Sequence, residues 1–139
     1  MKKLIVFSVV VILFMTGSCM THISKAEAPI KTVKVLRETK EWTPNSIKAM
    51  IRFVSREYDY PADKLIWLAD AESDFRHNVI GDSGKAVGIF QIWPLTWKGF
   101  VEEYDLEYTD RTNPVDQTIA TISALKDGKK CLWSPYKCK

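Results

Sequence analysis

Apolar residues recur along the chain at helical spacing, in four blocks that prolines and glycines separate. Each block begins at a proline that suits the first turn of a helix, and these are Pro44, Pro61, Pro94 and Pro114. Thr43 supplies a capping hydroxyl before the first block, the third block runs to about Tyr104, and Gly128 follows the last. The pattern predicts four helices.

Between the second and third blocks, residues 77–92 are rich in turn signals. The tetrapeptide Gly81-Asp82-Ser83-Gly84 is the strongest of them, and residues 86–92 form an apolar run broken by one glycine and one amide. We expect a small hairpin in this stretch. The sequence therefore predicts one small, mainly helical domain with a short β-like flap.

The first 26 residues have the pattern of a secretory signal, since two lysines precede an apolar run over residues 4–15 that is too short for a comfortable membrane span. Cleavage after Ala26 is one outcome. Residues 16–19, Thr-Gly-Ser-Cys, resemble a bacterial lipobox, and cleavage there would leave Cys19 lipidated and the protein anchored to a membrane. An uncleaved anchor is the third outcome.

The rest of the chain divides into a linker and a domain. Residues 27–42 have mixed charge and little periodicity, so we predict a linker there and place the folded domain at residues 43–139. The formal net charge of +3 comes from three lysines in the first 26 residues, and the remainder carries 17 basic and 17 acidic side chains. A nucleic-acid-binding domain normally has a basic excess, so we expect no nucleic-acid partner.

The cysteines of the predicted domain are Cys131 and Cys138. In an oxidising compartment they can form a disulfide, which would stabilise the fold by about 2–3 kcal/mol on the chain-entropy estimate. The alternative is a metal site, but it needs further ligands, and the histidines are His22 and His77 alone. We expect a disulfide and no metal.

Glu72 continues an apolar stripe on the second predicted helix. Leu65, Leu68, Ala69 and Glu72 lie at positions i, i+3, i+4 and i+7, which places them on one helix face. Burial disfavours the charged form of a carboxyl group, so a carboxyl on this stripe should have a raised pKa, as a general acid needs near neutral pH. The alternative is that Glu72, at the helix end, turns out to solvent.

Two motifs carry a resemblance to a known family. Glu72-Ser73 is followed, after the turn signal, by Gly84-Lys85-Ala86-Val87-Gly88-Ile89-Phe90-Gln91. At this spacing and in this order the motifs look like the lytic transglycosylase (SLT) family of lysozyme-like enzymes, which carries a Glu-Ser pair and then a Gly-Leu-Met-Gln type motif. Ile89 and Phe90 replace Leu and Met. The resemblance runs from about Thr43 to the C-terminus and implies an α+β lysozyme-like fold.

The resemblance implies an exported enzyme of the periplasm or cell envelope whose substrate is the glycan strand of peptidoglycan. Glu72 would protonate the bridging oxygen of the β-1,4 bond between N-acetylmuramic acid and N-acetylglucosamine. It would then take a proton from the muramic 6-hydroxyl, which closes a 1,6-anhydro ring without water or cofactor. We expect a monomer that serves wall turnover, a secretion apparatus or a phage.

Further site residues follow from the motifs. Ser73 resembles the family serine near the scissile bond, with a C-terminal helix cap or a local backbone bond as the alternative role. Gln91 resembles the glutamine that contacts substrate, and an amide within an apolar run needs polar partners. Gly88, Ile89 and Phe90 are expected to shape the floor of the cleft.

The later helix departs from the family pattern. The family usually carries an Ala-x-x-Asn-Ile type motif whose Asn contacts substrate, whereas residues 113–119 are Asn-Pro-Val-Asp-Gln-Thr-Ile. Gln117 is the stand-in, and Asn113 is expected to cap the helix. The tyrosines that could stack on sugars, with packing as the alternative, are Tyr104, Tyr108 and Tyr136. The tryptophans expected in the core are Trp93, Trp97 and Trp133.

Two other functions are compatible with these residues. If Asp74 or Asp82 oriented a water molecule, the enzyme would be a lysozyme-type muramidase, and its products would have reducing rather than anhydro ends. A non-catalytic peptidoglycan-binding protein on the same fold is the other, although it would have no reason to retain an acid on an apolar stripe.

Overall fold

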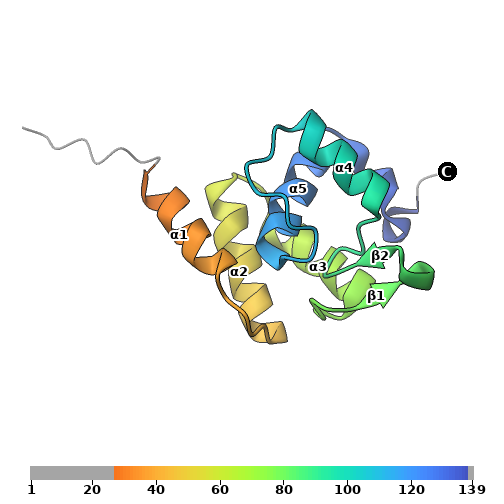
Figure 1. Cartoon of the computed structure of the whole chain (residues 1–139), viewed down its shortest axis with the longest axis horizontal. Helices are drawn as coiled ribbons and strands as arrows, with labels where there is room; N and C mark the ends of the chain where they lie inside the picture. Colours follow the sequence, from red (N-terminus) through yellow and green to blue (C-terminus); the bar gives the residue numbers. More distant parts are fainter. Residues whose placement is uncertain (1–26, 138–139) are drawn as a thin grey trace, which may run out of the picture.

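Five α-helices and one short hairpin make up residues 27–137, the part of the chain that the computed structural model describes. The helices are α1 (Glu27–Arg37), α2 (Pro44–Glu57), α3 (Ala62–Ser73), α4 (Pro94–Glu103) and α5 (Pro114–Lys126) (Figure 1). The shorter elements are β1 (Ile80–Gly81), β2 (Ala86–Val87) and the 3-10 helices η1 (Asp82–Gly84), η2 (Lys129–Leu132) and η3 (Ser134–Tyr136). The predicted leader with Cys19, and Cys138, lie outside the described residues. Within residues 27–137, no helix is both long and apolar enough to cross a membrane.

The four helices predicted from the prolines are all present, and the turn-rich stretch contains the hairpin. Thr43 caps α2, because its side chain accepts a hydrogen bond from the Ser46 N–H while the Ser46 hydroxyl accepts one from the Thr43 N–H. Asn113 caps α5 by accepting from the Val115 N–H at 2.9 Å. The predicted fold class, mainly helical with a short β flap, is confirmed.

The segment predicted as a linker contains helix α1 instead. Helix α1 packs against α5 and α2, and Val33 on it is buried in the common core. Its polar contacts include an ion pair between Arg37 and Asp116 of α5. Within this segment Ile30, Val33 and Leu36 recur every three residues among charged side chains, which is a helical pattern. The linker prediction overlooked this pattern.

Helix α5 is the centre of the fold. Residues 114–122 are all buried, and α1, α2, α4 and η2 pack around them (Figure 1). The buried hydroxyl of Thr118 donates to the Pro114 carbonyl at 2.7 Å. A helix that is buried all round presents different side chains to different neighbours. Asp116 pairs with α1, and Gln117 bonds to the segment that follows β2.

The hairpin lies beside the C-terminal end of α3, at the edge of the molecule and across from α4 (Figure 1). Its strands are antiparallel, with Ile80 opposite Val87 and Gly81 opposite Ala86. A further bridge joins Val87 to Ile92, so the chain continues to turn after β2. We call residues 79–92, which include the hairpin and this turn, the flap.

Of the three tryptophans expected in the core, two are there. Trp97 is 8% exposed and Trp133 is 5% exposed, but Trp93 is 43% exposed, so the prediction for Trp93 is wrong. Trp93 is the N-cap residue of α4, and its indole N–H donates to Asp82 Oδ2 at 2.9 Å. This bond holds the ring on the surface, against the turn of the hairpin.

Candidate active site

Helix α3 places Glu72 at the end of its buried face. Leu65, Leu68 and Ala69 of the predicted stripe have no exposed surface, and Glu72, one turn further on, is half-buried. Burial raises the pKa of the Glu72 carboxyl, and the negative charge of Asp82 raises it further. Within the described residues no group hydrogen-bonds to this carboxyl. It is therefore a half-buried acid that holds its proton to higher pH than an ordinary glutamate.

The helix ends directly after Glu72, because the chain turns back at Asp74 and Phe75. Both residues have left-handed backbone conformations, with φ of 53° and 56°. The Asp74 N–H bonds to the Asp70 carbonyl, and the Phe75 ring is buried in the core. Of the two carboxylates considered as partners, Asp82 is the one whose charge acts on Glu72, across from α3 on the flap.

Ser73 ties α3 to the flap. It is 2% exposed, and its hydroxyl lies 3.0 Å from both the Ala69 and the Ile89 carbonyl oxygens, to which it donates. The bond to Ala69 is the local backbone bond expected as the alternative role of Ser73. The bond to Ile89 fixes the flap backbone beside Glu72, and a contact of Ser73 with substrate stays a prediction.

Gln117 is the second buried tie, and it too lies beneath the surface rather than on it. The side chain has no exposed area. Its Oε1 accepts from the Phe90 N–H at 3.0 Å, and its Nε2 donates to the Val87 and Arg111 carbonyls at 2.8 and 2.5 Å. Both amide hydrogens and one of the two lone pairs of the carbonyl oxygen are thus used by backbone groups of the flap and of the loop before α5. The predicted substrate contact of Gln117 is therefore corrected to a bridging role.

Gly88 is required by this bridge. Its φ is +80°, a conformation that suits glycine, and a Cβ at this position would lie only 2.2 Å from Gln117 Nε2. Ile89 and Phe90, expected on the cleft floor, have no exposed area. A residue of the cleft floor would need exposed surface to meet a ligand. Because these two side chains have none, they anchor the flap in the core.

Two more side chains, from residues that are not part of the flap, hydrogen-bond to the flap backbone. The Trp133 indole N–H donates to the Phe90 carbonyl at 3.0 Å, and Arg111 Nη1 donates to the Lys85 and Ile92 carbonyls at 2.8 Å each. Together with Ser73 and Gln117, they bind the flap to α3, to α5, to the loop before α5 and to the C-terminal turns. Such a site is held rigid before any ligand arrives. Sequence patterns gave no sign of the roles of Trp133 and Arg111.

Gln91 is the last residue of the motif, and its side chain stays partly accessible. It is half-buried, with φ of 48°, and its Nε2 donates to the Gly88 and Val79 carbonyls at 2.8 and 3.3 Å. A Cβ on Gly81 would lie 2.3 Å from Gln91 Oε1, so the hairpin leaves room for this amide. Gln91 therefore closes the hairpin and retains an accessible edge.

The exposed aromatic side chains differ from those that the sequence predicted. Tyr136 is half-buried and meets Trp67 edge to face, with ring centroids 5.2 Å apart. Trp67 and Trp93 are exposed by 46% and 43%; Trp93 was expected in the core, and Trp67 was not singled out by the sequence. Trp93 also borders a small hollow together with Gln91, Ile92, Thr96, Leu132 and Trp133.

Tyr104 and Tyr108 lie elsewhere. With Tyr58 they line a cavity of about 230 Å³, whose floor includes Ile119 and Ser123 of α5. Ile119 is two residues after Gln117, which places it on the opposite side of the helix from the flap. Neither Glu72 nor a flap residue lines this cavity, so these two tyrosines are not part of the candidate active site.

Metal and disulfide chemistry can be described for residues 27–137 only. In that range no group of three or more His, Cys, Asp or Glu side chains is arranged to hold a metal ion. Cys131 is disulfide-bonded. Its predicted partner, Cys138, lies outside the described residues, so the pairing of these two cysteines stays a prediction.

Comparison with known proteins supports the resemblance seen in the motifs. No curated protein and no solved structure matches the chain. A family model described as the transglycosylase SLT domain matches residues 49–135, more than half of the chain, and this range contains Glu72, the flap and Gln117. The mainly helical structure with its two-stranded sheet agrees with a small α+β lysozyme-like domain. The chain belongs to the transglycosylase SLT family.

Proposed function

We propose that this protein is an exported lytic transglycosylase that cleaves the β-1,4 bond between N-acetylmuramic acid and N-acetylglucosamine, with Glu72 as both acid and base. Membership of the SLT family supports transglycosylase action on peptidoglycan. The observation that carries the assignment of Glu72 is its place, half-buried at the end of an apolar stripe and facing the charge of Asp82.

In the first step the protonated Glu72 gives its proton to the bridging oxygen. The bond from C1 of the muramic residue to that oxygen breaks, and C1 becomes an oxocarbenium-like centre while the leaving sugar departs with its hydroxyl. A raised pKa keeps the proton available for this step near neutral pH. The Glu72 carboxylate then remains half-buried and is a stronger base than an exposed one.

In the second step the Glu72 carboxylate takes the proton of the muramic 6-hydroxyl. The 6-oxygen attacks C1 and forms the 1,6-anhydro ring, so the bond broken at C1 is replaced without water. Glu72 is again protonated, and the cycle needs no cofactor. One carboxyl group suffices because the nucleophile, the 6-hydroxyl, belongs to the substrate.

The flap supplies the wall of the site in this proposal. Gln91, Trp93 and Tyr136 retain accessible surface and are the residues assigned to contact sugars, through the amide edge and through stacking on aromatic faces. The buried ties beneath them hold the flap at a fixed place relative to Glu72. A fixed geometry lowers the cost of ordering the site when substrate binds.

A hydrolytic muramidase is the second candidate, and the placement of Asp82 favours it. The charge of Asp82 acts on Glu72, and its carboxylate is held by the Trp93 indole. A water molecule oriented by Asp82 would attack C1 in place of the 6-hydroxyl. A peptidoglycan-binding protein without catalysis is the remaining alternative.

Export belongs to the proposal as well. It is supported by the signal pattern of residues 1–26, by the disulfide at Cys131 and by the peptidoglycan substrate of the family. Lipidation of Cys19 would add a membrane anchor. Loss of membrane attachment on Cys19→Ser, followed by fractionation of cells, tests that anchor.

Product analysis tests the enzymatic proposal. Purified protein is incubated with peptidoglycan, and the masses of the released muropeptides are measured by mass spectrometry. The same digestion is carried out with the Glu72→Gln and Glu41→Gln variants. Glu41 is an exposed glutamate and serves as the matched control. Anhydro products from the wild type and Glu41→Gln, absent with Glu72→Gln, are expected. Reducing-end products would establish the muramidase, and binding without products would leave the binding protein.

A further inference from the structure

We propose that helix α1 positions the flap from a distance, with Arg37 as the positioning residue and the loop at residues 109–113 as the connection. The turnover part of this inference rests on the proposed function, whereas its structural part does not. Three sets of contacts join helix α1 to the flap, from α1 to α5, from α5 to the loop, and from the loop to the flap.

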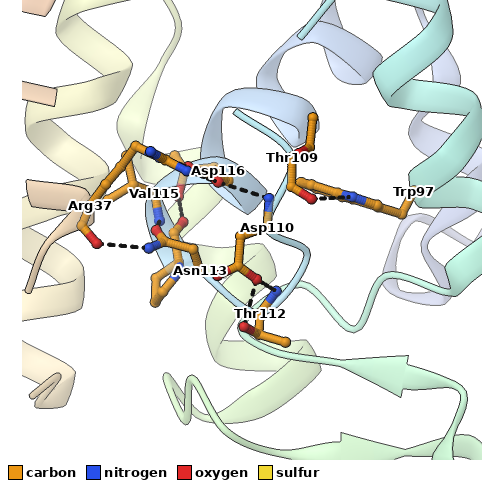
Figure 2. A network of polar contacts seen from close by, with 10 residues as sticks. Arg37, Trp97, Thr109, Asp110, Thr112, Asn113, Val115 and Asp116 are labelled. Atoms are coloured by element: carbon orange, nitrogen blue, oxygen red, sulfur yellow. Dashed lines mark hydrogen bonds and ion pairs between the residues drawn. The ribbon is translucent and has the colours of Figure 1, made fainter. Parts of the chain in front are cut away.

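The first contact is a two-point ion pair between α1 and α5. Arg37 donates through Nε and Nη2 to the two carboxylate oxygens of Asp116, the Nη2 to Oδ2 distance being 2.8 Å (Figure 2). The Asp116 side chain has no exposed surface, and that of Arg37 is 25% exposed. The Arg37 guanidinium also lies 4.0 Å from the centroid of the Tyr108 ring. A carboxylate buried to this degree depends on its cation.

The second set of contacts attaches the loop to this pair. Asp116 Oδ2 accepts from the Asp110 N–H at 3.1 Å, and the Asn113 side chain donates to the Arg37 carbonyl at 3.0 Å. Asp110 Oδ1 in turn accepts from the N–H and hydroxyl of Thr112. Figure 2 shows the loop held between Arg37 on one side and Trp97 on the other, whose indole N–H donates to Thr109.

The third set joins the same loop to the flap. Arg111 lies between the loop residues that α1 holds, and its guanidinium donates to the Lys85 and Ile92 carbonyls at 2.8 Å each. Its own carbonyl accepts from Gln117 Nε2, and Gln117 also binds the Phe90 N–H. Neighbouring residues of α5, Asp116 and Gln117, thus bond to α1 and to the flap.

Loss of the Arg37 charge should therefore weaken the hydrogen bonds that hold the flap. The Asp116 carboxylate would be left buried and unpaired, and it would reach solvent only by displacing the loop that it holds. The loop carries Arg111, so the flap would lose the bonds at Lys85 and Ile92. The effect would reach Lys85 and Ile92 through the loop and Arg111.

Hydrogen exchange of the full-length protein tests the structural part. The reporter is the Phe90 amide, which bonds to Gln117, and the reference is the Tyr58 amide at the end of α2, which bonds to Val54. Arg37→Met should raise Phe90 exchange roughly tenfold more than Tyr58 exchange, because local opening affects the flap before the core. Lys34→Met, which removes an exposed charge from the same helix, should change neither. Equal acceleration at both amides, or none, would overturn the proposal.

A double-mutant cycle separates positioning from a general loss of stability. Arg111→Met removes the two side-chain bonds to the flap and keeps the Arg111 carbonyl. If α1 acts through Arg111, Arg37→Met should add little to the Phe90 exchange rate in that background. Independent effects that multiply would refute the connection. Turnover of peptidoglycan should follow the same pattern, and an inactive wild type would count against the proposed function while leaving the exchange result intact.

Discussion

The close contact between Gly88 and Gln117 predicts that replacing Gly88 by alanine will lower the stability of the fold. Gly88→Ala places a methyl group 2.2 Å from Gln117 Nε2, so the amide must move away from the backbone groups it serves. A side chain at positive φ costs roughly 1–2 kcal/mol. Displacement of a buried amide that leaves polar groups unpaired costs about 1–3 kcal/mol more.

Gly84→Ala is the matched control. Gly84 has φ of +93°, but a Cβ there meets nothing within 4 Å, so this substitution brings the backbone cost without the clash. We expect Gly88→Ala to lower the free energy of unfolding by about 2 kcal/mol more than Gly84→Ala. That difference corresponds to an additional fall in Tm of roughly 8–16 °C for a domain of this size, measured by thermal denaturation followed by circular dichroism.

A Gln117→Ala background makes the test specific. The clash is absent there, so Gly88→Ala should cost no more than Gly84→Ala does. Equal losses for the two glycine variants in the wild-type background would refute the reasoning. So would a Gly88→Ala cost that is the same with Gln117 and without it, since the bridge would then not be its cause.

Three further predictions concern Glu72 and its surroundings. Asp82→Asn removes the negative charge that raises the Glu72 pKa, so the alkaline limb of the kcat–pH profile should move to lower pH; complete loss of activity would instead indicate an essential Asp82. Because the folded-state pKa of Glu72 is raised, the folded state binds more protons than the unfolded state between the two pKa values, and stability falls as pH rises through that window. Glu72→Gln should therefore raise Tm at neutral pH and not at a pH below both values; an equal gain at both pH values would exclude this cause. Trp93→Ala should raise KM for soluble glycan fragments about tenfold with a smaller change in kcat, as expected for loss of a stacking surface, and an unchanged KM would remove Trp93 from the site.

The sequence predicted those parts of the fold that depend on local signals. Prolines in the first turn and capping side chains at Thr43 and Asn113 act within a few residues, so α2 and α5 begin where the pattern placed them. Helix α1 was missed because charged side chains separate its apolar residues, Ile30, Val33 and Leu36. Its docking depends on tertiary partners, which are the core around Val33 and the Asp116 carboxylate of α5.

The candidate site divides in the same way. The apolar stripe predicted the burial around Glu72, since helical periodicity fixes which residues share a face. Residue type alone could not separate a ligand-binding amide from a bridging one, and Gln117 proved to be fully buried while Gln91 stays accessible. The exposed ring of Trp93 was missed because the hydrogen bond to Asp82 that holds it there joins residues from two different elements.

Digestion of peptidoglycan in water enriched in oxygen-18 separates the transglycosylase from the muramidase, because the two mechanisms differ in whether a water oxygen reaches C1. We predict muropeptides with 1,6-anhydro ends that carry no label, formed by the wild type and not by Glu72→Gln. Reducing-end products that each carry one labelled oxygen would contradict this prediction, since the attacking group would then be water and not the muramic 6-hydroxyl.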